Sequence, residues 1–198
     1  MAVSTNCRQV VESAHSPSLI MKASNWRPRL RRAGVDPALA DWLQEPRSLT
    51  ARLQRRGQFR VELLQQKKLE AKPDEFLPLG LPGRCRCWVR EVALHCDGQV
   101  LVFAHTVLPV QPRGVLNRWF ARLGSRSLGT LLFLHPGFIR GDLSFLRIDA
   151  RHPLYRPAVA ATGMAPKYFH ARRCLHRYRQ QAVLVTEIFS PALIGPAE

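Results

Sequence analysis

The sequence lacks the features that mark membrane-spanning and secreted proteins. No run of apolar residues approaches the ~20 that a membrane span requires. The first 21 residues mix Asn6, Arg8, Glu12 and His15 with apolar residues, unlike the compact apolar stretch of a signal peptide. The five cysteines are odd in number and have no paired spacing, so they do not form a disulfide framework. We therefore expect a cytoplasmic protein without stable membrane insertion.

Acidic residues are scarce. Fourteen Asp and Glu residues stand against thirty Lys and Arg in 198 residues, which gives a formal net charge of +16. The basic excess lies mainly in residues 1–35 and 150–186, and the second stretch contains no acidic residue. No recognition-helix, RNP or zinc pattern accompanies this charge. We therefore expect no nucleic-acid partner and favour a protein that handles small anions.

Motifs for a bound cofactor or a covalent catalyst are also missing. Three cysteines and two histidines lie between residues 85 and 105, but their C-x-C spacing matches no standard zinc pattern. No nucleophile-elbow motif accompanies the seven histidines. Segment 124–129 lacks the lysine and the preceding strand of a phosphate-binding loop. The sequence therefore predicts no metal site and no cofactor.

Enough apolar sequence is present for one core. Hydrophobic residues make up 46% of the chain and aromatic residues 8%, and the length suits a single domain. Residues 1–33, in which Ser, Asn, Pro and Arg dominate, are expected to form a flexible basic leader, with translation starting at Met1 or Met21. Residues 34–198 are expected to form the domain.

Strand patterns joined by hairpins, with helical pairs between them, run along this domain. Helical pairs are expected at 36–57, where Asp36 and Ser48 provide N-caps, and at 115–134. Strands are expected at 58–64, 87–94, 99–108, 138–149, 169–179 and 182–189. Asp97-Gly98 is a strong hairpin turn, whereas 72–84 and 152–167 are expected to be irregular. This order implies an α+β fold with an antiparallel sheet.

Two charged residues occupy apolar faces of the predicted strands. Arg90 and Glu187 each share a strand face with three apolar side chains. A buried charge is costly without a partner, so two interpretations remain open. In the first, both residues are ordinary exposed groups or form an ion pair with each other. In the second, they mark the two ends of a water-poor pocket. In the pocket, Arg90 would clamp a carboxylate ligand through its planar fork.

Besides these two residues, a series of short sequence segments extends over most of the chain. They are Asp41-Trp42-Leu43, Ser48-Leu49-Thr50, Trp88-Val89-Arg90-Glu91-Val92, Asp97-Gly98, Thr106-Val107-Leu108-Pro109-Val110, Leu123-Gly124, Leu128-Gly129, Ala171-Arg172-Arg173, and Leu184-Val185-Thr186-Glu187-Ile188-Phe189 with Pro191-Ala192. In this order the segments resemble the bacterial chorismate pyruvate-lyase family over roughly residues 36–193.

The resemblance implies a monomeric α+β protein with a six-stranded antiparallel sheet and helices on one side. It also implies an internal ligand cavity under two helix-turn-helix flaps. The implied reaction converts chorismate to 4-hydroxybenzoate and pyruvate, the first committed step of ubiquinone biosynthesis, without a cofactor. A non-catalytic domain of the same fold that binds a small aromatic acid as an effector is the alternative, because ligand-binding domains of some bacterial transcription regulators resemble this fold.

The resemblance also assigns site residues. Arg90 would hold the ring carboxylate and Glu187 would face the ring hydroxyl, so these two are the catalytic candidates. Leu49 and Leu128 would supply backbone contacts from the two flaps. Leu49 stands where the family has methionine, which a main-chain contact should survive. A bare carboxylate would repel a dianionic substrate, so Glu187 is expected to be protonated or paired to a cation.

Overall fold

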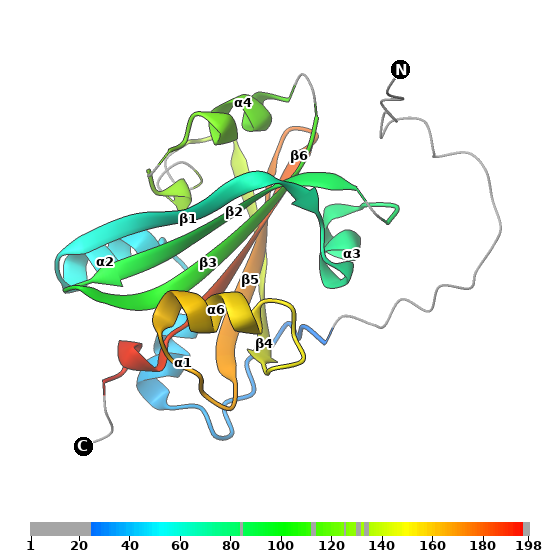
Figure 1. Ribbon diagram of the computed structural model, residues 1–198. Helices are drawn as coiled ribbons and strands as arrows, with labels where there is room; N and C mark the ends of the chain where they lie inside the picture. Colours follow the sequence, from blue (N-terminus) through cyan, green and yellow to red (C-terminus); the bar gives the residue numbers. More distant parts are fainter. Residues whose placement is uncertain are drawn as a thin grey trace.

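The computed structural model describes residues 25–83, 85–111, 114–124, 126–129, 132 and 135–195. Its strands are β1 (Phe59–Glu70), β2 (Arg86–Cys96), β3 (Gln99–Pro109), β4 (Phe138–Ile148), β5 (Phe169–Tyr178) and β6 (Gln181–Phe189). They form one antiparallel sheet in the order β1-β2-β3-β6-β5-β4 (Figure 1). The predicted α+β fold with a six-stranded antiparallel sheet is confirmed.

The turn between β2 and β3 forms where the sequence predicts it. Asp97 and Gly98 have φ angles of 51° and 81°, the left-handed conformation that a tight two-residue hairpin requires. The Asp97 carboxylate also accepts a hydrogen bond from the Gln58 backbone N–H at 2.8 Å. A Cβ atom on Gly57 would lie 2.1 Å from this carboxylate, so the contact requires glycine at that position.

β1 is longer than the sequence predicts, because it continues past Leu64 to Glu70. The pairing of β1 with β2 shifts register between Leu63 and Gln65. Such a bulge lets the ladder continue while it breaks the alternation of apolar and polar side chains. The period-two pattern therefore ends at the bulge, although the strand does not.

The first helical pair also forms as predicted. It consists of α1 (Pro37–Leu43) and α2 (Leu49–Arg56). The Asp36 carboxylate accepts from the Ala38 N–H at 2.7 Å, and the Ser48 hydroxyl accepts from the Ala51 N–H at 3.2 Å. These N-caps satisfy backbone donors that the helices leave open. In the second pair α4 (Val115–Ala121) is present, and most of the helix expected at 128–134 lies outside the described residues.

Two segments expected to be irregular contain helices instead. Residues 72–84 hold the 3-10 helix η1 (Pro73–Glu75) and α3 (Phe76–Leu79), and residues 152–167 hold α6 (Tyr155–Thr162). Pro157 is tolerated in α6 because it lies in the first turn, where a backbone N–H has no intrahelical acceptor. Gly163, with φ of 69°, ends that helix. A last 3-10 helix, η2 (Pro191–Leu193), follows β6.

Helices cover both faces of the sheet (Figure 1). On one face α1 and α2 pack their apolar side chains onto Val92, Leu94 and Ala104. On the other face α6 packs onto Phe103 and neighbouring side chains from β4, β5 and β6. None of the helices in the described part is long and apolar enough to cross a membrane. The sheet face under α2 also carries the pocket described below.

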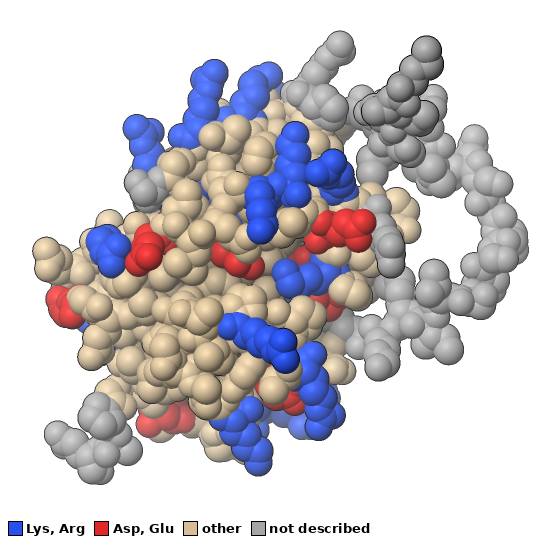
Figure 2. All heavy atoms as spheres, in the orientation of Figure 1, with Lys and Arg blue, Asp and Glu red and all other residues tan. Residues whose placement is uncertain are grey.

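The packed body begins before residue 34. Trp26 is only 9% exposed and joins the core under α6, and Arg27 forms an isolated β-bridge with Phe145. Basic side chains stand in several separate groups on the face drawn in Figure 2, with acidic side chains between them. This face therefore carries no single continuous basic patch.

Candidate functional site

A narrow pocket of about 60 Å³ lies on the sheet face that α2 covers, enough for a few water molecules. Its lining includes Arg90, Leu128 and Glu187, three of the four residues assigned from the sequence. Leu49 is buried in the adjacent core, and its neighbour Thr50 lines the pocket. The remaining described lining residues are Val61, Val92, Leu94, Ala104, Thr106, Ser127, Gly129, Leu132, Arg140, Arg172, Cys174, His176 and Val185.

The strand register explains why Arg90 and Glu187 reach the same pocket. Arg90 pairs with Thr106 on β3, and Thr106 pairs with Val185 on β6. Glu187 lies two residues beyond Val185, on the same sheet face. Two strand spacings and two residues separate their backbones by about 12 Å. Both side chains line the pocket that lies between these positions.

Arg90 is a buried cation held by neutral groups. Its side chain is 2% exposed, and its guanidinium donates to Gln66 Oε1 at 2.9 Å, to the Gly124 carbonyl at 2.6 Å and to the Arg126 carbonyl at 3.0 Å. Burial lowers the pKa of Arg90 to about 10, so it stays charged at neutral pH. No carboxylate among the described residues lies within 4.0 Å of it. The mutual pairing of Arg90 and Glu187, which the sequence left open, is not formed.

Glu187 is paired instead with Arg172, on the neighbouring strand. Its carboxylate accepts from Arg172 Nε at 2.6 Å. The same guanidinium donates to the carbonyls of Trp42, Leu43 and Glu45 at 3.3, 3.2 and 2.9 Å. These carbonyls lie at the end of α1 and in the turn that follows it. Arg172 therefore balances the charge of Glu187 and fixes the turn that joins α1 to α2.

Sequence reasoning singled out the segment containing Arg172 but gave it no role, and it missed Arg140, Cys174 and His176. Cys174 and His176 follow Arg172 at intervals of two residues along β5, so the period of two places all three on the same face of the strand. Arg140 could not be placed in this way. The pairing of β4 with β5 shifts register between Arg140 and Leu143, which changes the face onto which a simple alternation would put Arg140.

His176 is neutral in this environment. Burial, followed by the positive charges of Arg140 and Arg172, lowers its pKa to about 4. Burial also raises the pKa of the Cys174 thiol. These two groups thus add no charge to the pocket near pH 7, and the arginines and Glu187 set its electrostatic character.

Two chain segments meet over the pocket. The hydroxyl groups of Thr50, in the first turn of α2, and Ser127 lie 2.9 Å apart in a hydrogen bond. Both residues line the pocket. A Cβ atom on Gly129 would lie 2.7 Å from Thr50 Oγ1, so this approach depends on glycine. The segments that the sequence assigns to the two flaps are therefore in direct contact beside the pocket.

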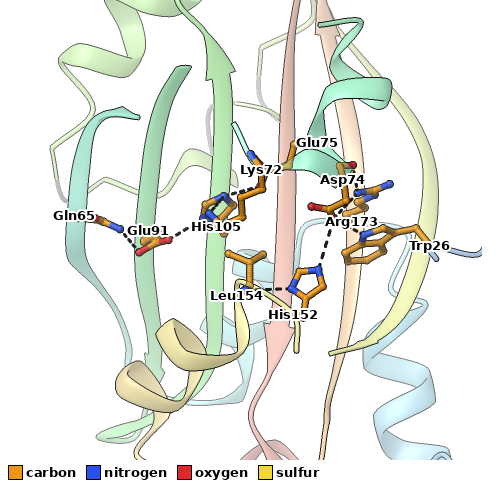
Figure 3. A network of polar contacts seen from close by, with 10 residues as sticks. All are labelled: Trp26, Gln65, Lys72, Asp74, Glu75, Glu91, His105, His152, Leu154 and Arg173. Atoms are coloured by element: carbon orange, nitrogen blue, oxygen red, sulfur yellow. Dashed lines mark hydrogen bonds and ion pairs between the residues drawn. The ribbon is translucent and has the colours of Figure 1, made fainter. Parts of the chain in front are cut away.

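A second polar cluster lies on the opposite sheet face (Figure 3). His105 is fully buried between Glu75 and Glu91, with N–O distances of 2.9 Å to each. Burial alone lowers the pKa of His105, but the hydrogen bonds to both carboxylates outweigh it, so the pKa is raised. No set of three or more His, Cys, Asp or Glu side chains in the part of the chain described here is arranged to hold a metal ion.

Asp74 extends this cluster toward β5 (Figure 3). It accepts from Trp26 Nε1 at 2.9 Å and pairs with Arg173 at 3.3 Å and His152 at 3.6 Å. Burial raises the pKa of Asp74, but these hydrogen bonds and charges outweigh it and hold the pKa at about 2. The cluster thereby connects η1 to β2, β3 and β5.

Solved structures resemble the fold. The C-terminal domain of the histidine utilization repressor from Pseudomonas syringae pv. tomato matches with a TM-score of 0.52 at 9% identity, over 68% of this chain and 93% of that chain. The effector domain of PhnF from Mycobacterium smegmatis matches with a TM-score of 0.50 at 16% identity, over 73% of this chain and 88% of that chain. At these identities the similarity concerns the fold alone.

Sequence comparisons identify the family. A probable chorismate pyruvate-lyase from Dechloromonas aromatica is 55% identical over 174 residues, which cover 87% of this chain and 98% of that protein. Another, from Ralstonia nicotianae, is 44% identical over 161 residues, covering 78% of this chain and 82% of that protein. The family model for chorismate lyase matches residues 20–195. This chain therefore belongs to the chorismate lyase family.

Proposed function

We propose that this protein is a chorismate lyase, which converts chorismate to 4-hydroxybenzoate and pyruvate and thereby supplies ubiquinone biosynthesis. One observation supports the assignment above all. Arg90, a buried cation without a carboxylate partner among the described residues, faces the same pocket as Glu187. A ring that carries a carboxylate at one end and a hydroxyl at the other is complementary to this pair.

The reaction demands little covalent chemistry from the protein. The C–H bond at the hydroxyl-bearing ring carbon and the neighbouring ether C–O bond break, and the ring becomes aromatic. The released enolpyruvate receives one proton at its methylene carbon and becomes pyruvate. The two products together contain all the atoms of chorismate, so no water, oxidant or reductant is consumed. The protein must bind the substrate, exclude water and hold a reactive conformer.

Arg90 and Glu187 meet these requirements at opposite ends of the ring. Arg90 would bind the ring carboxylate through two parallel hydrogen bonds, since its present partners are neutral oxygens. Glu187, paired with Arg172, would accept a hydrogen bond from the ring hydroxyl. The backbones of Leu49 and Leu128 would contact the substrate from the two covering segments.

We also propose that the protein acts as a monomer in the cytoplasm. The pocket volume of about 60 Å³ is small for chorismate. The contact between Thr50 and Ser127 must therefore open when substrate enters and product leaves.

The test is direct. Purified protein is incubated with chorismate without added metal or nucleotide, and 4-hydroxybenzoate and pyruvate are quantified. Equal amounts of both products, lost in Arg90→Gln, would support the proposal. Tight binding of 4-hydroxybenzoate without turnover of chorismate would contradict it and favour the effector-binding alternative.

A further inference from the structure

The charges of the pocket exceed what the product needs. Its described lining contains the three cations Arg90, Arg140 and Arg172 and the single carboxylate of Glu187. His176 is neutral because its pKa is lowered to about 4 by burial and the adjacent arginines. Glu187 balances Arg172 through their 2.6 Å contact. The described lining therefore contains two more cations than carboxylates. 4-Hydroxybenzoate brings one negative charge, and chorismate brings two.

Arg140 carries the second of these charges, at the Glu187 end of the pocket. It lies on β4 and pairs with His176 of β5. Burial lowers the pKa of His176, and the charges of Arg140 and Arg172 lower it further. Its guanidinium also donates to the Pro46 carbonyl in the turn between α1 and α2. In the strand order, Arg140 on β4 therefore lies beyond Glu187 on β6 when counted from Arg90 on β2.

The shape of chorismate matches this placement. The ether carbon of its ring is next to the hydroxyl carbon and lies away from the carbon that bears the ring carboxylate. If Arg90 holds the ring carboxylate and Glu187 the hydroxyl, the enolpyruvyl group must lie at the Glu187 end. Resting on the function proposed above, we infer that Arg140 binds the enolpyruvyl carboxylate of the substrate. A guanidinium has five N–H donors, enough to bind a carboxylate and keep its protein contacts.

This assignment makes Arg140 a residue that distinguishes substrate from product. Once the ether bond breaks, the carboxylate bound to Arg140 leaves as part of pyruvate, and 4-hydroxybenzoate keeps only the contacts to Arg90 and Glu187. Arg140 would therefore strengthen the binding of chorismate and leave the affinity for 4-hydroxybenzoate nearly unchanged. A residue with only a structural role would alter both affinities together.

The experiment compares two aromatic ligands by calorimetry. One is 4-hydroxybenzoate, and the other is 3-(carboxymethoxy)-4-hydroxybenzoate, which adds a second carboxylate at the ether position. We expect Arg140→Gln to weaken binding of the dicarboxylate and to lower kcat/KM for chorismate, each by about 10- to 100-fold, because a charge-assisted contact is lost. Binding of 4-hydroxybenzoate should change less than about threefold, which also shows that the variant is folded. Arg177→Gln, an exposed change on β5, is the matched control.

Equal weakening of both ligands by Arg140→Gln, or no weakening of either, would overturn the inference. Arg140→Lys should recover part of the dicarboxylate affinity, because a cation returns without the fork geometry. Failure of the proposed function is recognised separately. The unmodified protein would then form no product from chorismate, whatever Arg140→Gln does to the two aromatic ligands.

Discussion

Arg90 and Arg172 are both almost completely buried, yet their charges are balanced in different ways. Arg172 has a carboxylate partner in Glu187, whereas Arg90 donates to an amide oxygen and two carbonyls. A buried cation without a counter-ion costs free energy that an anionic ligand can recover. This difference supports the proposal that Arg90 receives the carboxylate of the ligand and that Arg172 positions Glu187.

Removal of Arg90 should therefore weaken ligand binding strongly. Arg90→Ala leaves the ligand carboxylate buried without a partner, which costs about 2–5 kcal/mol. We expect the Kd for 4-hydroxybenzoate to rise at least about 30-fold, as measured by calorimetry. Arg90→Lys should recover little of this, because an ammonium cannot form two parallel bonds. An Arg90→Ala variant that binds as tightly as the parent would refute the pocket assignment.

Glu187 should affect turnover more than binding. Glu187→Gln keeps the size of the side chain and an oxygen that can accept from Arg172 and from the ring hydroxyl. We expect the Kd for 4-hydroxybenzoate to change less than about tenfold. If Glu187 accepts the ring proton, kcat should fall about 100-fold or more, as loss of a general base does. A glutamine variant with nearly full kcat would leave Glu187 a positioning role only.

At the scale of elements, two segments distant in sequence meet beside the pocket, and we propose that their contact covers it. Thr50 bonds to Ser127, and Gly129 leaves the room that Thr50 needs. Thr50→Val removes the hydrogen bond at nearly constant volume, and Gly129→Ala places a methyl group against the same hydroxyl. Each change should weaken the closed cover and leave the sheet unaffected.

We expect both variants to release 4-hydroxybenzoate several-fold faster in stopped-flow dissociation. Their melting temperatures should stay within a few degrees of the parent, because a partly exposed hydrogen bond contributes about 1 kcal/mol. Thr162→Val, which alters a hydroxyl on α6 away from the pocket, is the control. Unchanged release rates in both variants would show that the cover opens elsewhere.

On the other sheet face, His105 joins η1 to the central strands. Its pKa is raised by Glu75 and Glu91, and that of Glu91 is lowered by His105, against its own burial. The protonated form of His105 therefore adds stability below its unfolded pKa of about 6.5. That stability is lost as the pH rises through the folded value.

Urea unfolding between pH 6 and pH 9 tests this coupling. The free energy of unfolding should fall over this range in the parent protein. His105→Gln removes the cation that bridges two buried carboxylates, so we expect a loss of about 3–5 kcal/mol near pH 6. The difference between the two proteins should shrink as the pH rises. A constant difference would show that His105 acts through packing alone.

At the scale of the whole molecule, catalysis should need nothing beyond the folded chain. Chorismate and the two products have the same total composition, so the reaction takes up neither electrons nor water. We expect kcat to be unchanged after dialysis against EDTA and on addition of divalent metal ions, as measured by 4-hydroxybenzoate formation. Activity that disappears with EDTA and returns with a metal would contradict a mechanism of binding and positioning.

Much of the fold could be predicted because its signals are local. The caps at Asp36 and Ser48 and the turn at Asp97-Gly98 each depend on a few neighbouring residues. The placement of Arg90 and Glu187 on apolar faces depends only on the period of two in a strand. These features and the ordered family segments were enough to predict the sheet, the family and a pocket between the two residues.

The remaining features were decided by tertiary structure, since they depend on which strands meet and in what register. The pairing of Glu187 with Arg172 requires β5 beside β6, and Arg140 reaches the pocket through a register shift in β4. The helix α6 forms against a core supplied by distant strands, and local pattern does not encode that support. The sequence by itself determined which residues are apolar, capped or charged, whereas only the folded sheet determined which charges face one another, because ion pairing depends on distances between chain segments far apart in sequence.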